Sequence, residues 1–188
     1  MKTRHLAALL AALLLTLGAA GHTEGAPLTL TGDLAKDSAA IMAHNKKVVA
    51  VDSATGGTDR FLVITYLARS GLDTLLGATD DLHDLVRDVC QAKGGTPLPS
   101  LLIKLLEPAV DQYGNKVHGE LFFLAWHSAT LERINWANLE GWQLLELAIP
   151  AKMTPMGRTT AATYCRDAIP GGYGRQLCAR FAALEQKQ

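Results

Sequence analysis

The chain lacks the short motifs that mark the common enzyme classes. Its 188 residues contain no GxSxG or SxxK nucleophile pattern, no HExxH or CxxC pattern, and no glycine-rich loop ending in GKS or GKT. Serine hydrolases, zinc proteins and phosphate-binding loops usually carry these signatures. From the sequence we therefore predict no catalytic residue, no metal and no cofactor.

An excess of one charge is also missing. The chain holds 18 Lys and Arg residues against 18 Asp and Glu residues. A nucleic-acid-binding domain usually presents a basic face, so this balance argues against a nucleic-acid partner. Beyond residue 20, no apolar run reaches the roughly 20 residues that a membrane-spanning helix needs. We therefore expect a chain that does not span a membrane.

The first twenty residues are typical of a secretory signal peptide. Lys2 and Arg4 form a basic start, Leu6–Leu17 is apolar, and Gly18-Ala19-Ala20 supplies small residues for cleavage after Ala20. The apolar stretch is too short to cross a bilayer. We expect residues 1–20 to be removed and the mature protein to be periplasmic or secreted.

Three cysteines allow one disulfide and one remaining thiol in an oxidising compartment. Cys165 and Cys178 are close in sequence and lie in the same C-terminal segment, so we predict that they pair. Cys90 falls on the apolar side of a predicted helix. We expect it to be the free thiol and to be buried as a small hydrophobic residue.

The remaining sequence divides into a flexible leader over residues 21–32 and a single globular domain over residues 33–188. Apolar spacing and capping residues predict helices over residues 33–43, 72–93, 128–148, 159–168 and 173–184. The predicted disulfide joins the last two, residues 159–184. Residues 47–51 fit either a strand or a helix, and residues 148–155 are expected to form a linker.

Residues 59–70 are ambiguous between helix and strand. Thr58 as an N-cap and Gly71 as a terminator favour a helix, whereas the run Val63-Ile64-Thr65 favours a strand. Periodicity does not separate a buried helix from a buried strand at this length. We predict a helix here.

The strongest hairpin signal covers residues 101–127, with a turn at Gly114-Asn115. A two-residue turn predicts that Asp111 lies opposite His118. Strand parity then places His118 and His127 on opposite faces. We expect an α+β fold in which four to six helices pack around this hairpin or a small antiparallel sheet.

A group of acidic residues and a histidine opens the helix predicted over residues 72–93. On a helix, Asp80, His83 and Asp84 share one face, so they are candidates for a metal site or an acid/base group. Acidic residues in a first helical turn also suit the helix dipole when no metal is present. The ordinary interpretation is a solvated helix start.

Three tryptophans, Trp126, Trp136 and Trp142, fall within 17 residues. Tryptophan is common in the cores of small domains and enriched at protein interfaces. Together with His127 they form a candidate interaction surface.

Export and the absence of catalytic motifs favour a protein that acts by binding another envelope protein. An acidic segment over residues 73–90 and a basic one over residues 151–188 are consistent with this function. We expect an accessory component of a secretion, conjugation or surface-assembly system. One alternative is a periplasmic inhibitor or immunity-type protein. Another is a small periplasmic hydrolase whose site uses His83, His118 or His127 with a carboxylate.

Overall fold

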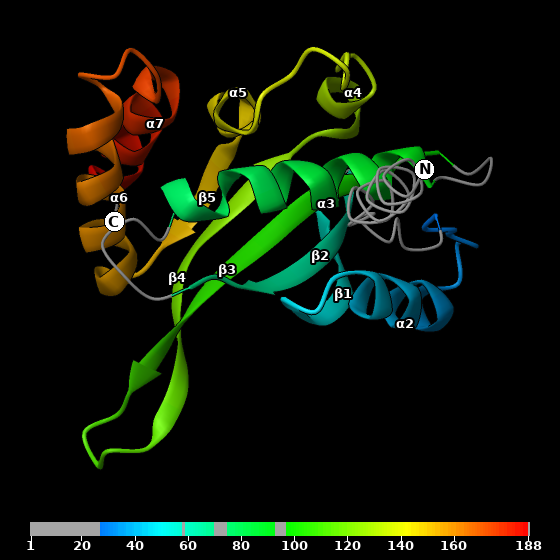
Figure 1. Ribbon diagram of the computed structural model, residues 1–188, viewed down its shortest axis with the longest axis horizontal. Coiled ribbons are helices and arrows are strands. Elements are labelled where there is room, and N and C mark those ends of the chain that lie inside the picture. The colour runs from blue at the N-terminus through cyan, green and yellow to red at the C-terminus, as the bar shows by residue number, and fades with distance from the viewer. Residues whose placement is uncertain (1–26, 58, 70–74, 93–96, 188) are drawn as a thin grey trace, which may run out of the picture.

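Five strands form one mixed sheet in the order β1-β2-β3-β4-β5 (Figure 1). The strands are β1 (Val48–Gly56), β2 (Asp59–Leu67), β3 (Ser100–Val110), β4 (Lys116–Trp126) and β5 (Ile149–Met153). Neighbouring strands are antiparallel except β2 and β3, which are parallel. This computed structural model describes residues 27–57, 59–69, 75–92 and 97–187. The predicted signal peptide and residues 21–26 of the predicted leader lie outside the described residues.

Six α-helices accompany the sheet in the described part of the chain. They are α2 (Leu34–His44), α3 (Thr79–Gln91), α4 (Ser128–Leu131), α5 (Gly141–Leu147), α6 (Pro155–Ala168) and α7 (Arg175–Glu185). A 3-10 turn, η1 (Leu76–Ala78), leads into α3. Parallel strands need a crossover connection, and α3 lies on the connection from β2 to β3, across the sheet (Figure 1). The α+β class is confirmed. The sheet, however, is mixed and larger than the antiparallel one we expected.

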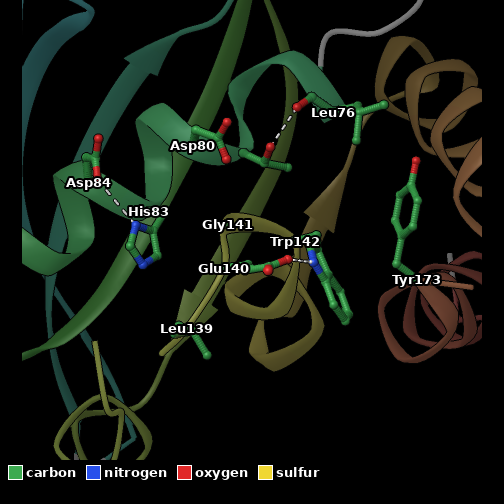
Figure 2. Close-up of a pocket in the computed structure, with 10 residues that line it drawn as sticks. Leu76, Asp80, His83, Asp84, Leu139, Glu140, Gly141, Trp142 and Tyr173 are labelled. Atoms are coloured by element: carbon green, nitrogen blue, oxygen red, sulfur yellow. Dashed lines mark hydrogen bonds and ion pairs between the residues drawn. The ribbon is translucent and has the colours of Figure 1, made fainter. Parts of the chain in front are cut away.

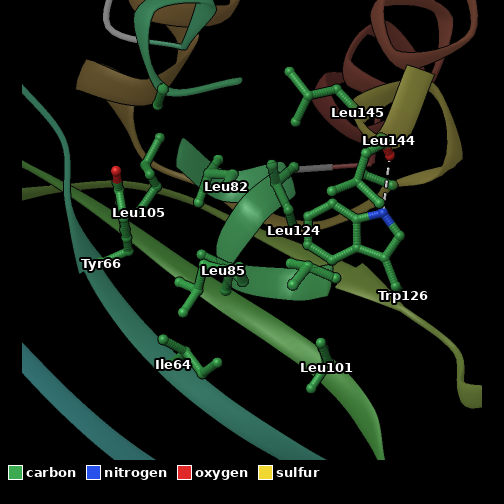
Figure 3. Packing of buried hydrophobic residues seen from close by; sticks show 14 of the residues in the cluster. Ile64, Tyr66, Leu82, Leu85, Leu101, Leu105, Leu124, Trp126, Leu144 and Leu145 are labelled. Carbon is green, nitrogen blue, oxygen red and sulfur yellow. Dashed lines mark hydrogen bonds between the residues drawn. The ribbon is translucent and has the colours of Figure 1, made fainter. Parts of the chain in front are cut away.

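The hydrophobic core lies between α3 and the sheet. Leu82 and Leu85 on α3 are at most 1% exposed, and so are Ile64 on β2, Leu101 on β3 and Trp126 on β4. Figure 3 shows these side chains gathered together. Along β2, buried residues alternate with partly exposed ones, which is the pattern of a strand with only one face in the core.

The predicted helix over residues 33–43 is confirmed as α2. Asp33 caps it, because its side chain accepts hydrogen bonds from the backbone nitrogens of Ala35 (3.0 Å) and Lys36 (3.2 Å). The chain just before α2 is held by Asp37, whose carboxylate accepts a 2.7 Å hydrogen bond from the Thr31 backbone nitrogen. The backbone nitrogen of Leu30 donates a 3.1 Å hydrogen bond to the carbonyl oxygen of Ala92. The chain before α2 is therefore also attached to the end of α3.

The prediction of a helix over residues 59–70 is wrong, because residues 59–67 form strand β2. The β-branched residues Val63, Ile64 and Thr65 suit the pleated surface of a sheet. Pairing on both sides, with β1 and with β3, decides in favour of the strand. The linker predicted over residues 148–155 is also wrong in part, because residues 149–153 form the edge strand β5.

The predicted hairpin is confirmed as β3 and β4, but its predicted register is wrong. The loop is longer than two residues, since the strands end at Val110 and resume at Lys116. His118 therefore lies opposite Pro108 rather than opposite Asp111. Asp111 instead organises the loop by accepting hydrogen bonds from the backbone nitrogens of residues 113 (2.9 Å) and 115 (2.8 Å).

The disulfide between Cys165 and Cys178 is confirmed, with a Cα–Cα distance of 5.7 Å. It joins α6 to α7. Cys90 is 6% exposed, lies within α3 and takes no part in a disulfide. None of the helices among the described residues is long and apolar enough to cross a membrane.

Candidate functional site

The sequence-predicted acidic group opens onto a groove of about 370 Å³ between α3 and α5 (Figure 2). We call it the α3–α5 groove. Its walls come from three parts of the chain that are far apart in sequence: the start of α3, the start of α5, and the loop before α7. The lining residues are Leu76, Thr79, Asp80, His83, Asp84, Leu139, Glu140, Gly141, Trp142 and Tyr173.

Close contact between two helix starts builds the floor of the groove. A Cβ atom on Gly141 would lie only 2.8 Å from the carbonyl group of Thr79, so α5 approaches α3 this closely only because residue 141 is glycine. Glu140 and Gln143 form a capping box that begins α5. The capping box therefore places Glu140 at the rim of the groove, with Trp142 one residue into the helix.

Three carboxylates face the groove, and their partners differ. The Asp84 carboxylate forms an ion pair with the Arg87 guanidinium group, with 2.8 Å between oxygen and nitrogen. The Glu140 carboxylate accepts a hydrogen bond from the Trp142 indole nitrogen. Asp80 is exposed, and within the described part of the chain it makes no hydrogen bond or ion pair. Asp80 is thus the lining carboxylate that has no side-chain partner among the described residues, and its Oδ1 atom lies 2.8 Å from the position that a Cβ on Gly141 would take.

Two aromatic rings form the opposite wall. The centroids of Trp142 and Tyr173 lie 6.2 Å apart and their planes are tilted by 50°. Both side chains are partly exposed, and Figure 2 shows them on the side of the groove away from His83. Tyr173 is positioned by a 3.2 Å backbone hydrogen bond from its nitrogen to the carbonyl oxygen of Ala168.

His83 lies at the other end of the groove and is largely buried. Its side chain is 12% exposed, its Nδ1 atom is 3.3 Å from the Asp84 carboxylate, and its ring packs edge-on against Trp136 at 5.7 Å. The Nε2 atom is buried without a hydrogen-bond partner among the described residues. The histidine therefore packs as a partner of Trp136 and Asp84.

The structure brings Asp80, His83 and Asp84 to one groove, as their spacing predicted. Across the described ranges, however, no three His, Cys, Asp or Glu side chains are placed so that they could hold a metal ion. Whether the group has an acid/base role stays a prediction. Sequence reasoning missed Glu140 and Tyr173 as members of this site, because they lie 60 and 93 residues after Asp80 and only the fold brings them together.

The predicted interaction surface is dispersed. Trp126 is fully buried and belongs to the core, Trp142 lines the groove, and Trp136 packs against His83 and the core without lining the groove. His127 is exposed at the end of β4, where its Nδ1 atom pairs with Asp59 at 2.8 Å. Of these four residues, Trp142 lines the groove together with the acidic group.

A second feature is a projecting arm, made of residues 107–119, which we call the β3–β4 arm (Figure 1). β2 pairs with β3 only as far as Leu106, and β5 pairs with β4 only from Phe122, so the two long strands continue beyond the sheet. Large apolar side chains are exposed along the arm: Val110 at 67%, Tyr113 at 79% and Val117 at 40%.

The base of the arm is fixed to the body. A Cβ atom on Gly119 would lie 2.7 Å from the Met156 sulfur, so the start of α6 packs closely against β4. Glu120 sits between Lys104 and Lys152, at 2.7 Å from each ammonium group. These contacts hold the arm in one direction relative to the sheet.

Comparison of the chain with protein-family models, with curated proteins and with solved structures gives no match. The groove and the arm are therefore the basis for an assignment of function.

Proposed function

We propose that this protein is exported to the cell envelope and acts by binding another envelope protein through the β3–β4 arm. The observation that carries the proposal is the exposure of Val110 and Tyr113 at the end of the arm. Exposed apolar residues that are gathered on one projection usually mark a binding surface. The assembly in which we place the protein is a secretion, conjugation or surface-assembly system, where it would be an accessory component.

The arm is suited to side-chain contacts with a partner. Burying a valine or another large apolar side chain is worth about 1.5–3 kcal/mol, and tyrosine is enriched among the residues that dominate binding energy. The hydrogen bonds from residues 113 and 115 to Asp111 hold the loop in one conformation before binding. A preorganised loop loses less conformational entropy when it docks.

The arm is less suited to strand addition. Pro108 lies in β3 within the arm, and proline has no backbone N–H to donate to a further strand. Proline on an edge is one of the devices that prevent uncontrolled strand pairing. This favours recognition by Val110 and Tyr113 over an extension of the sheet.

Two separate features support export. Residues 1–20 have the composition of a signal peptide. The disulfide between Cys165 and Cys178 is a bond that forms and persists in oxidising compartments and is rare in the cytosol.

Site-specific crosslinking tests the proposal. We expect a photoreactive residue at position 113 to capture one envelope protein in living cells. The same residue at position 42, where Met42 is 37% exposed on α2, should not capture that protein. The double variant V110S/Y113S should lose the complex while keeping the unfolding midpoint of the wild type. If positions 113 and 42 capture the same set of proteins, the arm is not the binding surface.

The inhibitor alternative is favoured by the same arm, because a rigid projection with an exposed tyrosine can fill a pocket of an enzyme. The identity of the captured protein separates the two functions. If the captured protein is an enzyme whose activity falls when the purified protein is added, the function is that of an inhibitor. If the captured protein is a structural subunit of an assembly system, the function is that of an accessory component.

The hydrolase alternative has one observation in its favour, the contact between His83 and Asp84 at the edge of a groove. The Nε2 atom of His83 is buried, however, and a general base must reach the proton that it removes. Hydrolysis of ester or peptide substrates that is lost in the variant H83Q would support this alternative.

A further inference from the structure

We propose that the α3–α5 groove binds a basic side chain, a lysine or an arginine, presented by a partner protein. The proposal rests on the protein-binding function above for the source of the cation. The cation chemistry itself rests on the residues of the groove. Binding through the arm and cation binding in the groove are tested by different experiments, so either proposal can be refuted while the other stands.

The charge of the groove selects a cation. Three carboxylates line it, those of Asp80, Asp84 and Glu140, and no lysine or arginine is among the described lining residues. Arg87 pairs with Asp84 and the Trp142 indole with Glu140, so that among the described residues the exposed Asp80 carboxylate is the one without a side-chain partner. The three carboxylates would repel an anionic ligand, and a cation would add to the stabilisation that Asp80 already receives from the start of α3.

The aromatic wall selects an organic cation. A lysine ammonium or an arginine guanidinium within about 6 Å of a ring centroid is attracted by the electron-rich ring face, most strongly with tryptophan. Trp142 and Tyr173, 6.2 Å apart, offer two such rings on one side of the groove. The methylene groups of a lysine or arginine can also pack along these rings while the charged end reaches Asp80.

A metal ion fits this groove less well. Indole and phenol rings supply no ligand of the kind that zinc or calcium prefers. A cavity of about 370 Å³ accommodates a long side chain, whereas a metal ion needs several ligands converging at little more than 2 Å. Within the residues that the structure describes, no cluster of three potential ligands exists.

Nuclear magnetic resonance with small model compounds tests the proposal. The ¹⁵N-labelled protein is titrated with Nα-acetyl-lysine amide, with Nα-acetyl-arginine amide and with the neutral Nα-acetyl-norleucine amide. We expect the indole N–H signal of Trp142 to shift and saturate with the two cationic compounds. The norleucine compound should leave it unchanged. Ile103 is buried in β3, away from the groove, so its backbone amide signal serves as an internal control.

Two substitutions locate the binding. D80N should weaken binding of the arginine compound about two- to fivefold, as expected for one partly screened charge contact. W142L should weaken it by a similar factor through the lost ring. D52N is the matched control, because Asp52 is an exposed carboxylate on β1, outside the groove. An unshifted Ile103 amide signal in each variant shows that the fold is intact.

Each other outcome overturns the proposal. Equal shifts with the norleucine compound mean that the groove binds apolar groups. Tighter binding of putrescine than of the lysine compound assigns a free diamine as the ligand instead of a protein side chain. The third outcome is that the Trp142 indole signal shifts neither with the lysine and arginine compounds nor with a peptide of about ten residues rich in lysine and arginine. In that case the groove binds no basic side chain. Crosslinking through position 113 is unaffected by all three results.

Discussion

The indole nitrogen of Trp126 donates a 2.9 Å hydrogen bond to the carbonyl oxygen of Leu144. Trp126 is the last residue of β4, and Leu144 lies within the last four residues of α5, whose carbonyl groups have no partner inside the helix. The bond therefore attaches α5, and with it the rim of the α3–α5 groove, to the sheet.

We expect W126F to lower the free energy of unfolding by about 2–3 kcal/mol, because it removes this hydrogen bond and leaves a cavity. W136F is the control. Trp136 is partly exposed, so its loss should be below about 1 kcal/mol. Urea unfolding followed by circular dichroism measures both. Equal losses in the two variants would contradict the structural role of the Trp126 bond.

Gly157 permits the contact between α6 and β4. A Cβ atom there would overlap the Leu121 carbonyl oxygen, which belongs to the backbone of β4 and cannot move aside cheaply. We expect G157A to cost about 1–3 kcal/mol of stability. At Gly77 no atom of the described residues lies within 4 Å of an added Cβ, so G77A should unfold at the wild-type urea midpoint or slightly above it. A stable G157A protein would show that α6 can move away from the sheet.

The disulfide stabilises the C-terminal helices by restricting the unfolded chain. Cys165 and Cys178 are 13 positions apart in sequence, so removal of the disulfide in C165S/C178S should cost about 3 kcal/mol. Thiol counting in denaturant without reductant should return one group, Cys90. In the C90A background, reductant should still lower the unfolding midpoint. A count of three thiols would refute the pairing.

Glu120 makes stability depend on pH. Hydrogen bonds from Lys104 and then Lys152 hold the pKa of Glu120 below its ordinary value of 4.5. Because the pKa is lower in the folded state, the stabilisation is fully present above pH 4.5. It is lost as the pH falls through the lower, folded-state value. We expect E120Q to be less stable than wild type by about 0.5–1 kcal/mol near neutral pH, with the difference shrinking below pH 4.5.

Urea midpoints measured in steps from about pH 6 downward check this expectation. The control is E132Q, because Glu132 is an exposed carboxylate on the surface. A stability difference between E120Q and wild type that stays constant across this range would rule out the linkage.

Two buried tyrosines should respond in opposite ways to loss of the hydroxyl group. Burial raises the pKa of Tyr164 to about 12, and its hydroxyl has no hydrogen-bond partner among the described residues. Y164F should therefore be neutral or stabilising by up to about 1 kcal/mol. The Tyr66 hydroxyl donates to the Asp81 carboxylate at 3.3 Å, so Y66F should cost about 1 kcal/mol. Thermal unfolding that shows equal changes would contradict this assignment.

The sequence by itself determined the features that depend on local periodicity and chemistry. The apolar spacing around Leu82 and Val86 placed α3, Asp33 marked the start of α2, and Gly114-Asn115 marked the hairpin loop. The proximity of Cys165 and Cys178 in sequence indicated the disulfide. Each of these signals is contained within about fifteen residues, and the physical cause is equally local.

Only the tertiary structure decided the features that depend on distant partners. Val63-Ile64-Thr65 forms a strand because β1 and β3 pair with it, and no local pattern reports that pairing. The β3–β4 arm projects because β2 and β5 end before it does. The groove exists because Gly141 lets α5 approach the start of α3, where Tyr173 from the end of the chain completes the wall. Strand pairing and helix–helix contacts join residues that are far apart in sequence, and the periodicity of side chains within one segment does not specify them.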